Sequence, residues 1–112
     1  MNWLDHEYLV PVIIGNGKEA IKVARKIYRK SGRRAQIFAE SFTFFQRLEF
    51  SCHTVFPMKE SFVFESLLAF SRSLEEYFYP VIIVYDDFSQ EIVDKNSDII
   101  ESAFLVRSYD EL

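Results

Sequence analysis

The fold of this chain is decided by one stretch, Pro11-Val12-Ile13-Ile14-Gly15-Asn16-Gly17-Lys18-Glu19-Ala20. An apolar run stops at a glycine, a second glycine follows two positions later, and a helical pattern begins at once. A nearly continuous apolar run is typical of a strand that is covered on both faces of a parallel sheet. A strand, a glycine turn and a helix in that order form the loop with which open α/β sheets hold a phosphate or a carboxylate.

The residues around this stretch predict a βαβ unit. Leu9 to Ile14 is the first strand, and Lys18 to Lys30 is a helix because its apolar residues recur at helical spacing. Ser31-Gly32 ends that helix, since glycine tolerates a left-handed cap. Ala35 to Ala39 is a second short strand, which we expect to be parallel to the first with a right-handed crossover.

The rest of the chain continues the alternation of strands and helices. We expect strands over Phe50–Phe56, Val81–Tyr85 and Ala103–Val106, and helices over Ser61–Glu76 and Phe88–Ser102. Asp87 and Gln90 have the spacing of a capping box that would open the last helix. This order predicts one Rossmann-like α/β domain over residues 1–112, an open and mostly parallel sheet of four to five strands with helices on both faces.

Ligands of such sheets bind outside the carboxyl ends of the strands, where the strand order reverses. Three loops should meet there: Gly15-Asn16-Gly17, Glu40-Ser41-Phe42 and Asp86-Asp87-Phe88. The candidate ligand-binding residues are therefore Gly15, Asn16, Gly17, Lys18, Glu40, Asp86 and Asp87.

The glycine loop has three interpretations that the sequence leaves open. Gly15-x-Gly17-x-x-Ala20 matches the dinucleotide fingerprint with alanine in third place, and Glu40 lies where a ribose-binding acid would sit. The same glycines also fit an anion or substrate contact, or a tight turn that binds nothing. Asn16 tolerates left-handed backbone angles and so can serve the turn alone.

No catalytic residue and no metal site stands out. Asp86 and Asp87 could hold a cation or a ligand hydroxyl, but helix capping explains them more simply. Cys52 and His53 are neighbours on a predicted strand, so their side chains should point to opposite faces and could not act as a nucleophile and its base. His6 has no Cys/His cluster beside it.

Composition and charge are those of an ordinary globular protein, and they predict neither a membrane nor a nucleic acid as a partner. No apolar run approaches the roughly 20 residues of a membrane helix. A basic cluster between Lys18 and Arg34 lies in a chain of net charge -4, which indicates a solvated helix face. The single cysteine, Cys52, fits a reducing cytoplasm, and no signal peptide is visible.

The middle of the chain is rich in phenylalanine. Seven Phe residues lie between Phe42 and Phe64. They predict either an exposed apolar patch, through which the chain could form a homo-oligomer, or a Phe-rich core under a long loop. The first alternative is also the basis for regarding the chain as a purely structural interaction domain.

Two stretches resemble a known family. Val10-Pro-Val-Ile-Ile-Gly-Asn-Gly17, followed by Ala24-Arg25 and Ser31-Gly32, resembles the opening of carboxylate–amine ligases of the ATP-grasp superfamily, and D-aspartate ligases begin in a similar way. Pro80-Val-Ile-Ile-Val-Tyr-Asp-Asp87, Ile92 to Ile100 and Ala103-Phe-Leu-Val-Arg107 look like the ending of the same pre-ATP-grasp domain. The resemblance spans about residues 8 to 110.

The resemblance implies a function that this chain does not perform alone. In the family, ATP phosphorylates a carboxylate and an amine attacks the acyl phosphate, with ATP and Mg²⁺ held mainly by the ATP-grasp domain that follows. We expect the ATP-grasp domain to be absent from this chain and to be supplied in cis or in trans in a full-length parent. We expect the chain itself to carry no cofactor. Gly15, Asn16 and Gly17 would line the substrate cleft, and Asp86 or Asp87 matches the acid after the fourth major strand.

The main alternative is a small Rossmann-type module that binds NAD or another nucleotide and has a regulatory role. It rests on Gly15, Gly17, Ala20 and Glu40.

Overall fold

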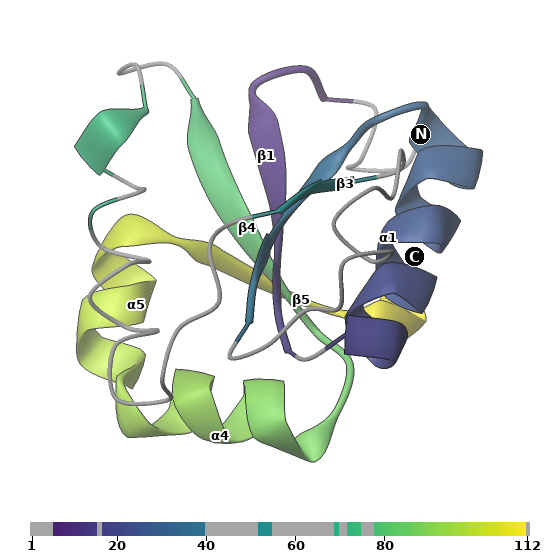
Figure 1. Ribbon diagram of the computed structural model, residues 1–112. Helices are drawn as coiled ribbons and strands as arrows, with labels where there is room; N and C mark the ends of the chain where they lie inside the picture. Colours follow the sequence, from purple (N-terminus) through teal and green to yellow (C-terminus); the bar gives the residue numbers. More distant parts are fainter. Residues whose placement is uncertain are drawn as a thin grey trace.

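The computed structural model of this chain describes residues 6–15, 17–39, 52–54, 69, 72–74 and 78–111. Five parallel strands form one open sheet in the order β3-β2-β1-β4-β5 (Figure 1). The strands are β1 (Leu9–Ile14), β2 (Ala35–Phe38), β3 (Cys52–Thr54), β4 (Tyr79–Val84) and β5 (Leu105–Ser108). The other elements are α1 (Gly17–Ser31), α4 (Asp87–Lys95), α5 (Ser97–Ala103) and the short 3-10 turn η2 (Tyr109–Glu111).

β1 is the centre of the sheet because it pairs with β2 on one side and β4 on the other. Ile13 lies opposite both Ile37 and Ile83, and all three side chains are fully buried. Burial of each such side chain contributes about 1.5–3 kcal/mol. Pro11 is tolerated in this central strand because it comes before Val12, the first residue of β1 that pairs with β2.

α1 covers one face of the sheet. Ala20, Ala24 and Ile27 recur at helical spacing and are completely buried against β1, β2 and β3. The helix ends as the sequence predicts, because Gly32 adopts a left-handed φ of 71° and its N–H donates to the Tyr28 carbonyl at 2.8 Å.

α4 and α5 cover the opposite face. Their buried residues Ile92, Val93 and Ile100 form a second cluster with side chains of β1, β2 and β4 that alternate with those facing α1. Helices on both faces of an open parallel sheet confirm the predicted α/β class.

The prediction of a single helix over Phe88–Ser102 is wrong. The structure has two helices that meet at Asn96, which ends α4 and precedes α5. The Asn96 side-chain amide donates to the Ile92 carbonyl at 3.0 Å, so it satisfies a backbone acceptor at the end of α4 that a continuing helix would have used. The last strand consequently begins at Leu105, two residues later than expected.

Other predictions fall outside the part of the chain that the structure describes. They include the Phe-rich segment, the loop after β2 and most of the helix expected over Ser61–Glu76. Among the helices that are described, none combines the length and the apolar character that a membrane span needs.

Candidate functional site

The order of the strands reverses between β1 and β4. The chain passes from β1 to β2 and β3 on one side, and from β4 to β5 on the other. Because β1 and β4 are parallel neighbours, the turn after β1 and the turn after β4 lie at the same edge of the sheet. The structure thus brings together two of the three loops expected at a ligand site.

Gly15 forms the turn after β1, and its conformation depends on having no side chain. Its φ is 156°, and its N–H donates to the Phe38 carbonyl at 3.0 Å, which ties the turn to the end of β2. A Cβ atom built on Gly15 would overlap the Tyr85 hydroxyl and lie 2.9 Å from Cζ of that ring. Packing against Tyr85 therefore explains Gly15 without any ligand.

Tyr85 is the residue at this site that the sequence did not single out. It follows Ile83 by two positions and packs on the same side of the sheet, against the cluster beneath α1. Its hydroxyl oxygen is buried and has no hydrogen-bond partner among the residues that the structure describes. Burial raises the pKa of the Tyr85 phenol, and the carboxylates of Asp86 and Glu19 raise it further. The hydroxyl therefore stays protonated at neutral pH.

Asp86 is the N-cap residue of α4. Its carboxylate accepts hydrogen bonds from the Ser89 N–H at 2.9 Å and from the Ser89 hydroxyl at 2.8 Å. The Ser89 hydroxyl oxygen also accepts from the Asp86 N–H at 3.3 Å, and Ser89 is fully buried. This reciprocal pair is a capping box, so the prediction that Asp87 and Gln90 form the box is wrong by one residue.

Gly17, Lys18 and Asp87 lie at helix starts on the same edge of the sheet. Gly17 is the first residue of α1, Lys18 is exposed in its first turn, and Asp87 is exposed as the first residue of α4. Within the described residues, no side chain accepts a hydrogen bond from the first amides of α1. Those amides, the helix dipole and the Lys18 charge all favour an anion.

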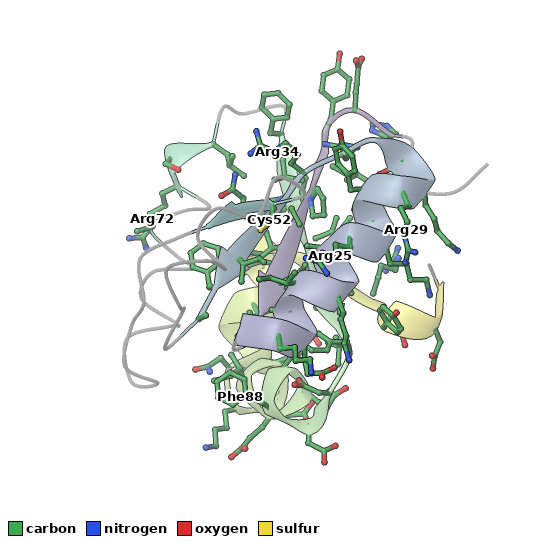
Figure 2. The ribbon with its side chains drawn as sticks, turned by 45° about the vertical axis from the view of Figure 1, so that its right-hand side comes forward. Arg25, Arg29, Arg34, Cys52, Arg72 and Phe88 are labelled. Atoms are coloured by element: carbon green, nitrogen blue, oxygen red, sulfur yellow. The ribbon has the colours of Figure 1, made fainter. Side chains whose placement is uncertain are left out.

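Two candidate residues, Asn16 and Glu40, lie outside the described part of the chain. Cys52 is buried beneath α1, and the Arg34 guanidinium donates to its carbonyl at 3.4 Å (Figure 2). In the described ranges no group of three or more His, Cys, Asp or Glu residues could hold a metal ion. The arrangement at the switch point can bind an anion, and its described residues do not assemble a nucleophile with a base.

No family model, no curated protein and no solved structure matches this chain. The strand order and the residues of the two turns are therefore the features that indicate a function.

Proposed function

We propose that this chain is the substrate-side domain of an ATP-dependent carboxylate–amine ligase of the ATP-grasp superfamily. One observation carries the proposal: a glycine turn and an acid-capped helix start lie together where the order of a parallel sheet reverses. The resemblance of the residues before Gly17 and after Pro80 to a pre-ATP-grasp domain supports the same assignment.

The two turns would have different roles in such a domain. The first amides of α1 and the Lys18 ammonium would bind the carboxylate of the substrate, because both present positive charge at the same helix end. Asp86 would shape the opposite wall through its bonds to Ser89 and would not contact the substrate. The chain would thus orient a carboxylate and leave its phosphorylation to another domain.

ATP and Mg²⁺ would be supplied by an ATP-grasp domain in cis or in trans. That domain would transfer a phosphoryl group to the carboxylate, and the amine would then displace the phosphate. A cytoplasmic setting agrees with the buried thiol of Cys52, the one cysteine of the sequence.

The test is calorimetry and ligand-observed NMR on the 112-residue chain. D-aspartate at millimolar concentration should give a saturation-transfer signal that Lys18→Glu abolishes and that Lys30→Glu, a reversal at the other end of α1, preserves. The chain alone should not hydrolyse MgATP. Silence with D-aspartate and with other amino-acid carboxylates, or ATP hydrolysis by the isolated chain, would overturn the proposal.

A second candidate function is a nucleotide-binding module. The observation that favours it is Ala20, which is completely buried where the dinucleotide fingerprint places the residue that lets helix and strand pack closely. Against it, Gly15 is already explained by Tyr85. Calorimetric titration with NAD, NADP, ATP and ADP separates the two candidates, since the module should bind one of these tightly and the ligase domain none.

A further inference from the structure

The described helices on the two faces of the sheet carry opposite charge. α1, on one side of the sheet, holds six basic residues against Glu19, namely Lys18, Lys22, Arg25, Lys26, Arg29 and Lys30. The α4–α5 pair with its cap, on the other side, holds six acids against Lys95, namely Asp86, Asp87, Glu91, Asp94, Asp98 and Glu101. In Figure 2, Arg25 and Arg29 mark the first of these faces and Phe88 marks the start of α4.

Each face has an exposed ridge of charges, and the two ridges have the same spacing. The basic ridge consists of Lys18, Lys22, Arg25 and Arg29, and the acidic ridge consists of Asp87, Glu91, Asp94 and Asp98. All eight residues are exposed, and in both ridges the steps along the chain are four, three and four. That spacing places the four basic residues on one side of α1, and Asp87, Glu91 and Asp94 on one side of α4. Asp98 extends the acidic ridge onto α5, whose axis runs in a different direction from that of α4 (Figure 1).

We infer that this chain associates with further copies of itself, the basic ridge of one copy against the acidic ridge of the next. The occupant is a second copy because the chain itself presents the complementary charges at matching intervals. Since the ridges lie on opposite faces of the sheet, two copies cannot pair both ridges with each other at once. The contact is therefore heterologous and continues from copy to copy.

Such an association is weak and sensitive to salt. Exposed ion pairs contribute little individually, so a contact of four pairs gives a dissociation constant on the order of a millimolar. The Debye length falls from about 30 Å at 0.01 M salt to about 3 Å at 1 M, which screens the ridges. The overall charge of -4 also opposes self-association, so the local match of the ridges must outweigh that repulsion.

The experiment is sedimentation equilibrium between about 0.05 and about 1 mM protein, a range that rises to the expected dissociation constant. In low salt the average mass should rise steadily with concentration without levelling at a dimer, and in about 0.5 M salt it should return to the monomer. K22E/R29E and E91K/D98K should each stay monomeric, because reversal of two of its four charges leaves the altered ridge with no net charge, and the intact ridge then has no complementary partner. An equimolar mixture of the two variants should form a 1:1 dimer, since K22E/R29E keeps the acidic ridge and E91K/D98K keeps the basic ridge.

Two matched control variants test whether charge reversals act through the ridges or only through the net charge. R72E/R107E and E7K/D110K change the net charge by the same amounts at exposed residues outside both ridges, and they should associate like the unmodified chain. Circular dichroism checks that every variant is folded, and recovery in the mixture shows that neither ridge variant failed for lack of structure.

Three results would overturn the inference. They are a monomer at every concentration in low salt, association that both reversal variants retain, and association that salt does not weaken. Binding of a single-stranded oligonucleotide to the basic ridge without self-association would also overturn it, and would identify a nucleic acid as the partner.

Discussion

The turns after β1 and β4 lie side by side, yet they begin their helices by different means. After β4, Asp86 and Ser89 satisfy the start of α4 with their own side chains. After β1, the turn depends on Gly15, whose missing side chain admits the Tyr85 hydroxyl. The comparison shows that the protein's own side chains satisfy the start of α4, whereas among the described residues no side chain accepts from the first amides of α1. The proposed carboxylate site rests on that difference.

Among the substitutions that test this difference between the two turns, Gly15→Ala should have the largest effect on stability. The new methyl group would overlap the Tyr85 hydroxyl in a backbone conformation that L-residues rarely adopt, so the free energy of unfolding should fall by about 3 kcal/mol or more. Urea denaturation measures it.

Gly32→Ala is the matched control for that substitution. Gly32 also has a positive φ, but a Cβ there would meet nothing within 4 Å, so the loss should be only about 1 kcal/mol. Equal losses at the two glycines would show that backbone angle alone, and not the contact with Tyr85, makes Gly15 necessary.

Asp86→Ala should have the next largest effect. It removes the N-cap of α4 and leaves the Ser89 N–H without its acceptor, at a cost of about 1–2 kcal/mol. The Ser89 hydroxyl loses the carboxylate but keeps the Asp86 carbonyl, at 3.1 Å, as an acceptor. Asp87→Ala, one residue further on, removes only an exposed charge in the first turn and should cost less than about 0.5 kcal/mol. The roles would be exchanged if thermal denaturation showed Asp87→Ala to be the more damaging change.

Tyr85→Phe should have a smaller effect than Asp86→Ala at neutral pH. The substitution removes a buried hydroxyl that has no partner among the described residues, so stability should rise by less than about 1 kcal/mol. It should also restore part of the stability lost by Gly15→Ala, because it removes the atom that the new methyl group overlaps. A double-mutant cycle without any coupling between the two sites would contradict the contact.

The same phenol predicts a dependence of stability on alkaline pH. The pKa of Tyr85 is raised in the folded protein above its value of about 10 in the unfolded chain. Above that pH the unfolded chain loses this proton while the folded protein keeps it, so the folded state loses stability as pH rises. The free energy of unfolding should be measured between about pH 9 and about pH 11, a range that spans the pKa of an ordinary tyrosine. Over this range Tyr85→Phe should lose less stability than the unmodified chain.

Much of the fold could be predicted from the sequence because its signals are local. The apolar runs before Gly15 and before Asp86 and the helical spacing of Ala20, Ala24 and Ile27 each report one element. The break at Asn96 was missed because hydrophobic periodicity continues across it, while a single side-chain bond decides where α4 ends.

The site was less predictable because it depends on contacts between distant residues. The contact between Gly15 and Tyr85 joins positions 70 residues apart, and only the pairing of β1 with β4 brings them together. The correct capping box had a local signal, a serine three residues after Asp86, but Asp87 with Gln90 offered the same spacing. The burial of the Ser89 side chain decides between the two pairs, and burial is a property of the folded chain.

The most direct measurement of the proposed site uses the glycines. The chain has three, Gly15, Gly17 and Gly32, whose amide signals are readily distinguished in a ¹⁵N–¹H correlation spectrum. Titration with D-aspartate should move the signals of Gly17 and Gly15 and leave Gly32, at the far end of α1, unchanged. If the signals of Gly15 and Gly17 stay fixed, with or without movement elsewhere, the turn after β1 does not bind the carboxylate and the proposed site is wrong.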